Sequence, residues 1–302
     1  MQKGDSLLVY KRPINFDQFV GQGRIIPLVK DELHTGKPFR HTLLFGPPGA
    51  GKSALSFLLA CQSGSTLIEY IASETWKSED IVKMLLDLPI EGYDEHGRPG
   101  PNAQHIFLLV DELHVMKAWE PWYSALTDFH VYRGGKPSWT AYFTLIGATN
   151  RPEDIPRPFI DRCPLQLHLQ PYTDEDVQKI IQAHFPEMSE HTAMDVARRS
   201  RGIPRRALSF AETVTMHGGS LQIFEVMGIS EDGLEPKDQL YLETLRHSDR
   251  PLSLHALAAA LGESRKTVQE HIEPYLLQRG YLLIDQSGRQ LATKSTRGRR
   301  QE

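Results

Sequence analysis

The stretch from 41 to 53, His41-Thr-Leu-Leu-Phe-Gly-Pro-Pro-Gly-Ala-Gly-Lys-Ser53, decides the fold of this chain. Its apolar run at 43–45 predicts a strand, and a helical run at 54–60 follows directly. Between them lies G-x-x-x-x-G-K-S, the pattern of a phosphate-binding loop. An ordinary Gly/Pro turn would not require Lys-Ser directly after its last glycine. The stretch therefore predicts nucleotide binding within an α/β fold.

The residue types of this loop suit a triphosphate. Gly49 and Gly51 let backbone N–H groups approach phosphate oxygens, and the helix N-terminus adds a favourable dipole. Lys52 is expected to reach the terminal phosphates, and the Ser53 hydroxyl to bind Mg²⁺. The predicted nucleotide-binding residues of the loop are Gly46, Pro47, Pro48, Gly49, Ala50, Gly51, Lys52 and Ser53.

Two adjacent carboxylates, Asp111 and Glu112, follow a continuous apolar run at 106–110. Such a run predicts a strand buried on both faces of a parallel sheet, and ligands bind at the carboxyl ends of such strands. We expect Asp111 to hold Mg²⁺, directly or through water. Glu112 is expected to orient, or to accept a proton from, the water that attacks the γ-phosphate. A solvated acidic turn is the alternative.

A further buried strand is predicted at 143–146, ending in Gly147-Ala-Thr-Asn150. A polar side chain at this strand end is well placed to sense the γ-phosphate, and Asn150 is the candidate. The alternative is an ordinary turn asparagine.

Composition limits the class of protein. A chain of 302 residues predicts two or three domains, and 40% hydrophobic with 24% charged residues is typical of soluble proteins. We expect no membrane span and no signal peptide. Cys61 and Cys163 make neither a disulfide framework nor a metal site, which favours the cytoplasm. The net charge of −4 excludes a uniformly basic nucleic-acid binder, but 250–302 carry nine Lys or Arg against five Asp or Glu.

Strand-like and helical runs alternate as far as 169, which predicts a parallel sheet covered by helices. Ser78 is expected to cap a helix at 78–86, and 130–142 to form a short hairpin. Residues 89–102 predict an exposed loop that is long enough to suspect a function. From Thr173, which forms a predicted capping box with Asp176, the pattern becomes helical, and a linker is expected at 228–236.

The last segment predicts a winged helix. Helices are expected at 237–247, 253–260 and 264–279, followed by a hairpin of 281–284 and 291–293. Arg265 and Lys266 begin the third helix, where a recognition helix meets DNA, and Arg289 lies by the wing tip. These three are the candidate DNA contacts. Winged helices also serve as protein-contact modules, which is the alternative.

The motifs resemble those of AAA+ ATPases, and those of the RuvB family in particular, the bacterial motors of Holliday-junction branch migration. The loop at 46–53, Val110-Asp-Glu-Leu-His114 and Gly147-Ala-Thr-Asn150 carry the superfamily resemblance. Leu257-Ala-Ala-Ala-Leu-Gly-Glu263 and Glu273-Pro-Tyr-Leu-Leu-Gln278 are similar to the RuvB winged helix. Arg12-Pro-Ile-Asn-Phe-Asp-Gln-Phe-Val-Gly-Gln22 resembles its adenine-side segment, and Ala197-Arg-Arg-Ser-Arg-Gly-Ile-Pro-Arg205 its sensor 2.

The resemblance implies an α/β AAA+ domain with a parallel sheet at 1–171, a helical lid at 172–232 and a winged-helix DNA-binding domain at 233–302. It also implies ATP hydrolysis with Mg²⁺, and a homo-hexameric ring on duplex or four-way-junction DNA with ATP sites between subunits. Arg162 matches the arginine finger that acts in trans. Arg205 would touch the phosphates in cis. The remaining implied nucleotide contacts are Arg12, Val20, Tyr172 and Pro204.

The sequence also departs from the family. Segment 129–143 is shorter than the hairpin that docks RuvA and has no obvious apolar docking residues, so binding of a RuvA-like partner stays open. Asn150 stands where the family usually has Thr, and Ile160 replaces an Arg. Asp161-Arg-Cys163 resembles the Ser-Arg-Cys of clamp loaders.

Two functions therefore remain for what looks like a divergent member of the family. One is a DNA motor that drives branch migration. The other is a clamp- or helicase-loader-like switch that assembles a partner protein on DNA. A winged-helix adaptor with a weak ATPase is opposed by the intact set of Lys52, Asp111, Glu112, Arg162 and Arg205.

Overall fold

The computed structural model describes residues 12–89, 92, 94, 100, 103 and 105–292. The chain divides into two compact units, Met1–His184 with Ile203–Arg206, and Phe185–Gly202 with Ala207–Glu302. The predicted boundaries at 171/172 and 232/233 stay predictions. Most of the predicted loop at 89–102, and the basic residues from Lys294 onward, lie outside the described residues.

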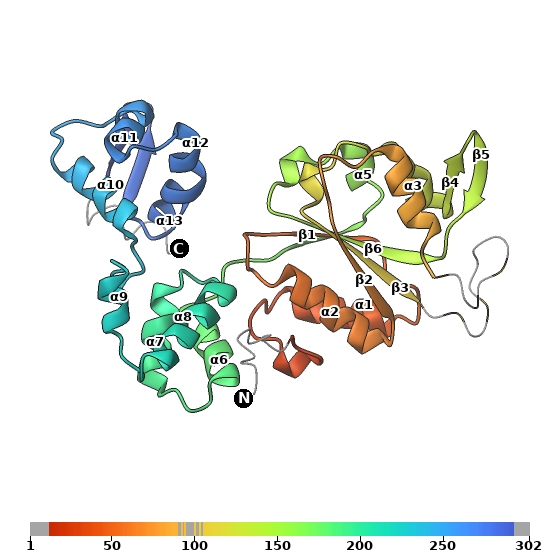
Figure 1. Ribbon diagram of the computed structural model, residues 1–302, viewed down its shortest axis with the longest axis horizontal. Helices are drawn as coiled ribbons and strands as arrows, with labels where there is room; N and C mark the ends of the chain where they lie inside the picture. The colour runs from red at the N-terminus through yellow and green to blue at the C-terminus, as the bar shows by residue number, and fades with distance from the viewer. Residues whose placement is uncertain are drawn as a thin grey trace, which may run out of the picture. The chain divides into compact units, whose positions relative to one another are not determined.

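The first unit is built on a five-stranded parallel sheet in the order β2-β3-β6-β1-β7 (Figure 1). Its strands are β1 (Thr42–Phe45), β2 (Thr66–Ile71), β3 (Ile106–Asp111), β6 (Phe143–Thr149) and β7 (Leu165–His168). The first strand lies inside the sheet, and Phe45 is in register with Thr149 at the end of β6. The loop after β1 therefore opens beside the ends of β6 and, one strand further, β3. The predicted parallel sheet is confirmed.

Side chains alternate across the sheet and supply two separate cores. Leu43, Leu108 and Leu145 pack on one face with α3 (Ser78–Leu86) and α4 (Glu120–Asp128). Their neighbours Leu44, Leu109 and Ile146 pack on the other face with α1 (Ile25–His34) and α2 (Lys52–Ser63). Figure 1 shows α1 and α2 on the face opposite α3. Burial of both faces explains why these strands are continuous apolar runs.

Two local predictions about this unit have different outcomes. Ser78 does not cap α3: the helix begins at Ser78, and the N–H of the preceding Lys77 donates to Asp80 Oδ2 at 2.9 Å. An aspartate at the third helical position reaches back in this way because its carboxylate meets the exposed N–H groups of the first turn. The predicted hairpin is confirmed, with β4 (His130–Arg133) and β5 (Lys136–Trp139) pairing antiparallel.

The helices from 174 onward divide between the units. The first unit contains α6 (Asp174–His184), at whose start Asp176 N donates to the Thr173 hydroxyl at 3.1 Å. The second contains α7 (Glu190–Arg199), most of α8 (Pro204–Met216), and α9 (Gln222–Val226), a short helix not predicted from the sequence. Within the described part of the chain, no helix is long and apolar enough to cross a membrane.

The second unit ends in the predicted winged helix, formed by α10 (Pro236–Arg246), α11 (Leu254–Leu261), α12 (Arg265–Thr267), α13 (Glu273–Gln278), β8 (Leu282–Asp285) and β9 (Gly288–Leu291). The third helix runs without a gap from Arg265 to Gln278, close to the predicted 264–279, but its middle turn at Val268–Ile272 is π-helical. Pro274 explains this turn, since proline lacks an N–H and its ring crowds the carbonyl four residues earlier. The second wing strand begins at Gly288, three residues before the predicted 291.

Candidate active site

The phosphate loop depends on two glycines. Gly49 and Gly51 have φ values of +78° and +94°, in the left-handed region that favours glycine. A Cβ atom at Gly49 would lie 2.6 Å from Ile203 Cγ2, and one at Gly51 would lie 3.0 Å from the Tyr172 hydroxyl. The loop is tied to the sheet by Gly46, whose N–H donates to the Thr149 carbonyl at 3.3 Å. These positions form a backbone cradle that side chains would fill, and it fits a chain of phosphates.

Lys52, the first residue of α2, is buried at the base of this cradle. Its ammonium donates to the carbonyl oxygens of Gly46 at 2.9 Å and Pro47 at 3.2 Å. Burial lowers the pKa of Lys52, the carboxylates of Asp111 and Glu112 oppose that shift, and the charge of Arg205 adds to it. Burial of the ammonium therefore outweighs the two nearby carboxylates, as is typical of a residue that receives an anion.

Ser53 and Asp111 meet across the gap between α2 and β3. The Ser53 hydroxyl lies 3.3 Å from Asp111 Oδ2, and Asp111 Oδ1 accepts the N–H of Glu112 at 2.8 Å. A hydroxyl and a carboxylate are hard oxygen ligands of the kind that Mg²⁺ takes together with phosphate oxygens. The donor set therefore fits the predicted metal.

Glu112 is held in an unusual backbone conformation, with φ +52° and ψ +38°. Its carboxylate is about half exposed and lies 3.5 Å from Nδ1 of the buried His114. The same Nδ1 atom is 3.1 Å from the hydroxyl of Thr149, which also accepts the N–H of Arg151 at 3.0 Å. The predicted sensor Asn150 lies next in the chain, exposed at the end of β6.

Sequence reasoning gave no role to His114 or Thr149. Both stand inside the motifs quoted for the resemblance, His114 two residues after Glu112 and Thr149 directly before Asn150. The sequence signal that could have identified His114 is its position two residues after the candidate base. Its contact with a threonine on the next strand depends on the pairing of β3 with β6, which cannot be read from the sequence.

The adenine-side residues come together around Tyr172. A Cβ atom at Gly21 would lie 2.7 Å from Tyr172 Cε1, so the ring packs against that backbone. Gln22 and Gln170 exchange two hydrogen bonds, at 2.7 and 3.1 Å, which fasten the N-terminal segment beside β7. Burial raises the pKa of Tyr172 to about 12, against a hydrogen bond with Gln22 that lowers it. Val20, next to Gly21, is half-buried.

Arg12 and Arg205 occupy different surroundings. The Arg12 guanidinium is exposed, pairs with Glu69 at 2.6 Å and stacks on the Phe57 ring at 5.5 Å. Arg205 follows Pro204 at the start of α8, and its Cβ lies 3.5 Å from where a Cβ of Gly49 would stand. Arg205 is therefore adjacent to the phosphate loop, whereas the contacts of Arg12 are with α2 and β2.

Arg162 lies just after α5 (Arg157–Ile160), and its guanidinium is docked on its own chain. Its Nε atom donates to the Tyr123 carbonyl at 3.0 Å and to the Thr127 hydroxyl at 3.2 Å. Its Nη1 atom donates to the Pro158 carbonyl at 2.6 Å, and the group stacks on the Tyr123 ring. None of the contacts described for Arg162 joins it to the phosphate loop of the same chain.

The three candidate DNA contacts differ. Arg265 and Lys266 are exposed at the start of α12, beside a surface hollow lined by Leu254, Ser264, Arg265, Lys266, Gln269 and Glu270. Arg289 instead donates to the buried carboxylate of Glu273 at 2.9 and 3.3 Å, and only 16% of its side chain is exposed. This pairing explains Arg289 as a structural residue, so we do not include it in the proposed DNA surface.

The β4–β5 hairpin presents aromatic side chains that the sequence did not make obvious. Tyr132 and Trp139 are 60% and 44% exposed, and the His130 ring contacts both, at centroid distances of 5.1 and 5.7 Å. The opposite face of the strand is anchored by Val131, which is fully buried in the core. We call His130, Tyr132 and Trp139 the aromatic face of the hairpin.

Comparison with known proteins identifies the family. The Holliday junction DNA helicase RuvB P-loop domain matches residues 11–169, and the RuvB C-terminal winged helix domain matches 231–297. Holliday junction branch migration complex subunit RuvB of Campylobacter fetus is 33% identical, covering 94% of this chain and 87% of its own length. The same subunit of Lactobacillus helveticus is 31% identical over the same shares.

Solved structures agree with these sequence matches. The Thermotoga maritima RuvB Holliday junction branch migration motor is 29% identical, with a TM-score of 0.73 over 94% of this chain and 96% of that one. A point mutant of that motor gives a TM-score of 0.75. The likeness thus covers the phosphate loop, the strand-end carboxylates and the winged helix together, and the chain belongs to the RuvB family of P-loop ATPases.

Proposed function

We propose that the protein is an ATP-driven DNA motor that moves Holliday junctions by branch migration. The supporting observation is that one chain carries both a phosphate loop with its strand-end carboxylates, at the ends of β1, β3 and β6, and a winged helix with exposed basic residues. The relatives that match over nearly its whole length are named as branch migration subunits. No specific observation favours the loader alternative.

The reaction is hydrolysis of the terminal phosphoanhydride of ATP. Backbone N–H groups of the loop and Lys52 bind the phosphates, and the ammonium exchanges its carbonyl partners on Gly46 and Pro47 for phosphate oxygens. Glu112 orients the attacking water and takes its proton as the new P–O bond forms and ADP leaves. Asn150 and Arg205 contact the phosphates from the strand end and from α8. Ser53 and Asp111 would hold Mg²⁺, which neutralises charge on the phosphates when it is bound.

The site is completed by a neighbouring subunit. The contacts described for Arg162 are with α4 and α5, and none of them reaches the phosphate loop of the same chain, which supports a role toward another chain. Such a finger stabilises charge that develops on the γ-phosphate. We therefore infer a homo-oligomeric ring, hexameric as the family resemblance implies, with one ATP site at each subunit boundary.

DNA and a second protein are the proposed partners. Arg265 and Lys266 would contact phosphates of duplex or four-way-junction DNA, the recognition geometry of a winged helix. The aromatic face of the hairpin would dock a RuvA-like protein, because exposed aromatic side chains on a rigid element are typical anchors of protein interfaces. Work on DNA would place the protein in the cytoplasm of a bacterial cell.

The proposal is tested by ATPase activity and movement of a synthetic four-way junction. We expect hydrolysis that depends on junction or duplex DNA, and dissociation of the junction that requires ATP. Glu112→Gln should bind ATP, remain on DNA and hydrolyse at least about a hundredfold more slowly; unimpaired turnover would refute its assignment as the base. Hydrolysis stimulated by a protein partner but by no DNA would instead support the loader function.

A further inference from the structure

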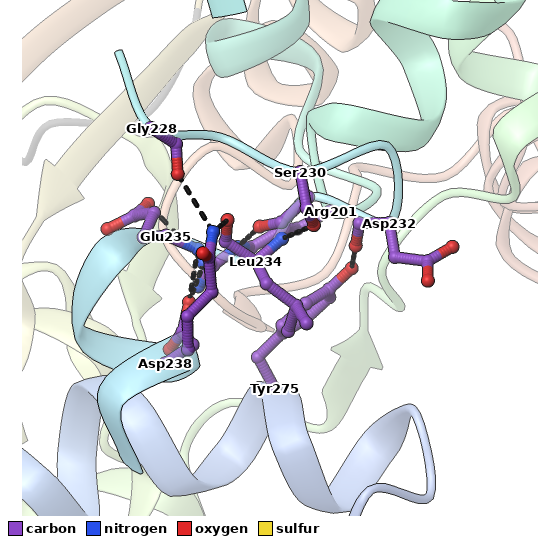
Figure 2. Close-up of polar contacts among 10 residues, drawn as sticks. Arg201, Gly228, Ser230, Asp232, Leu234, Glu235, Asp238 and Tyr275 are labelled. Carbon is purple, nitrogen blue, oxygen red and sulfur yellow. Dashed lines mark hydrogen bonds and ion pairs between the residues drawn. The ribbon is translucent and has the colours of Figure 1, made fainter. Parts of the chain in front are cut away.

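The connection between α7 and the winged helix is fastened by one buried arginine. Arg201 lies just after α7, and only 9% of its side chain is exposed. Its Nε atom donates to the Gly233 carbonyl at 2.8 Å, and its Nη2 atom donates to the carboxylate of Asp238 on α10. Its guanidinium also stacks on the Tyr275 ring of α13, 4.3 Å from the centroid. Figure 2 shows Asp238 and Tyr275 beside Arg201.

The segment at 228–236, expected to be a simple linker, is held on both sides. Gly233 approaches the end of α7 so closely that a Cβ there would lie 3.0 Å from the Arg199 carbonyl. On the other side, the Tyr275 hydroxyl donates to the Asp232 carbonyl at 2.5 Å, and Tyr281 donates to the Asp232 carboxylate at 2.9 Å. Figure 2 shows the Tyr275 contact. The segment is therefore a packed joint between α7 and the winged helix.

The position of Arg201 carries a conformational cost that its side chain offsets. Its φ of +62° is in the left-handed region, which residues other than glycine, asparagine and aspartate seldom occupy. Asp238 is almost fully buried, so its charge is stable only beside the guanidinium. Left-handed residues commonly end helices, but glycine usually fills that position. A residue that only linked two helices would need neither an arginine side chain there nor this buried partner.

Arg201 is also four residues from Arg205, the residue adjacent to the phosphate loop. Between them lie Gly202, Ile203 and Pro204, a short segment in which Pro204 restricts both itself and Ile203. Ile203 touches the loop at Gly49. A displacement of 203–205 by the nucleotide would thus reach Arg201 through very few rotatable bonds.

We propose that Arg201 is a positioning residue that couples the nucleotide site to DNA movement, because it clamps the winged helix to α7 as one rigid body. The proposal rests on the proposed function. When ATP binding or hydrolysis moves the start of α8, Arg201 makes the winged helix follow rather than swing freely at 228–236. Without the clamp, the protein hydrolyses ATP but converts little of it into movement of DNA.

The test uses variants that remove the clamp without leaving a buried charge. Arg201→Gln combined with Asp238→Asn replaces the ion pair by a neutral hydrogen-bonding pair, and Asn can still accept the Glu235 N–H that Asp238 accepts at 2.7 Å. Arg201→Gly, also combined with Asp238→Asn so that no buried charge is left unpaired, removes the side chain and suits the left-handed backbone. Arg198→Gln is the matched control, since Arg198 is exposed one turn earlier on α7.

Two readouts separate this proposal from the proposed function. The first is the number of junctions moved per ATP hydrolysed, which we expect to fall at least about tenfold in both Arg201 variants, with basal hydrolysis within about twofold of the parent. The second is the distance distribution between spin labels at His191→Cys on α7 and His255→Cys on α11, both exposed, with Cys61→Ser removing the exposed native thiol. It should be narrow in the parent and broad in the variants.

Each outcome decides the matter. A distribution as broad in the parent as in the variants overturns the clamp, and a distribution equally narrow in all of them shows that Arg201 does not make it. A distance distribution that broadens in the variants, with no loss of junctions moved per ATP, overturns the coupling role.

If the parent protein moves no junction, the proposed motor function fails. The clamp is then decided by whether a fluorescence pair on the native Cys61 and on His255→Cys responds to ATP in the parent but not in the variants.

Discussion

Nδ1 of His114 lies 3.1 Å from the Thr149 hydroxyl, which joins the strand that carries the candidate base to the strand that carries the candidate sensor. Glu112, in its left-handed backbone conformation, lies 3.5 Å from the same nitrogen. His114 is therefore well placed to orient the Glu112 carboxylate, and the contact with Thr149 fixes the imidazole.

Removing this contact should slow chemistry and spare binding. We expect His114→Ala and Thr149→Val each to lower kcat for ATP hydrolysis by about tenfold to a hundredfold, the size of effect that misplacing a catalytic group has. KM for ATP should stay within about twofold, because neither side chain contacts the phosphate loop in the structure. Steady-state kinetics measure both.

The double variant and a surface control complete this test. If both residues act through one hydrogen bond, the double variant should lose no more than the worse single variant. His191→Ala, which removes a histidine that is 87% exposed, should have no effect. Full additivity, or an unchanged kcat in His114→Ala, would show that His114 does not position Glu112.

Arg162 can be tested by mixing subunits. Arg162→Ala alone should lose at least about a thousandfold of ATPase activity, as arginine fingers do. Lys52→Ala should also be inactive, since it loses the phosphate ligand. Rings mixed from both should regain activity, because a Lys52→Ala subunit still offers Arg162 to its neighbour. Arg157→Ala, an exposed arginine on α5, is the control; inactivity of the mixture would argue against action in trans.

The winged helix offers a comparison between exposed and buried basic residues. Arg265→Ala and Lys266→Ala should weaken DNA binding, and each should reduce the slope of log affinity against log salt by about 1, with an unchanged melting temperature. Arg289→Ala should instead destabilise the domain by about 3 kcal/mol, because it leaves Glu273 buried without its partner. Fluorescence anisotropy and thermal unfolding separate the two effects. If folded Arg289→Ala loses as much DNA affinity as Arg265→Ala and Lys266→Ala do, Arg289 also contacts DNA.

His41 should make stability depend on pH. Its Nδ1 accepts the Leu145 N–H at 3.0 Å, so Nε2 carries the proton and donates to the Leu126 carbonyl at 3.1 Å. Burial lowers the pKa of His41 from 6.5 to about 4, with the nearby His105 lowering it further and the Leu126 bond opposing. Between pH 4 and pH 6.5, His41 is therefore protonated in the unfolded chain and neutral in the folded chain.

The sign follows from that difference in proton binding. The free energy of unfolding should fall by about 3 kcal/mol from this group as pH drops from above 6.5 to about 4. Denaturant unfolding at several pH values measures the slope, which His41→Asn should reduce. His191→Gln should leave it unchanged. An unaltered slope in His41→Asn would assign the pH dependence to other groups.

The aromatic face of the hairpin predicts a separable defect. Tyr132→Ser with Trp139→Ser should weaken binding of a purified RuvA protein by at least about tenfold, as loss of interface anchors does. ATP hydrolysis without the partner should not change, since both side chains are exposed and outside the nucleotide site. Lys136→Ser on the same hairpin is the control, and surface plasmon resonance is the measurement. Undiminished binding in the aromatic variant would place the docking surface elsewhere.

Much of the fold followed from local pattern. The runs at 43–45 and 106–110, and the helical start after Ser53, are set by burial on both faces of the sheet and by loop chemistry, both of which are local properties of the chain. The helix expected at 264–279 is helical from Arg265 to Gln278, but one of its turns is π-helical beside Pro274. The missing N–H and the ring clash of proline change the local hydrogen bonding without ending the helix.

The sequence by itself determined which residue types are available for the chemistry, because the loop at 46–53 and the pair Asp111-Glu112 sit next to their own strands. Tertiary structure decided which side chains meet across strands and helices. His114 reaches Thr149 only because β3 pairs with β6. Arg289 forms its ion pair with Glu273 only because the wing packs on α13. Arg201 looked like one basic residue among several until the fold buried it beside Asp238. Burial and long-range pairing set the free energy of a charge, and neither is a property of the residue's neighbours in the chain.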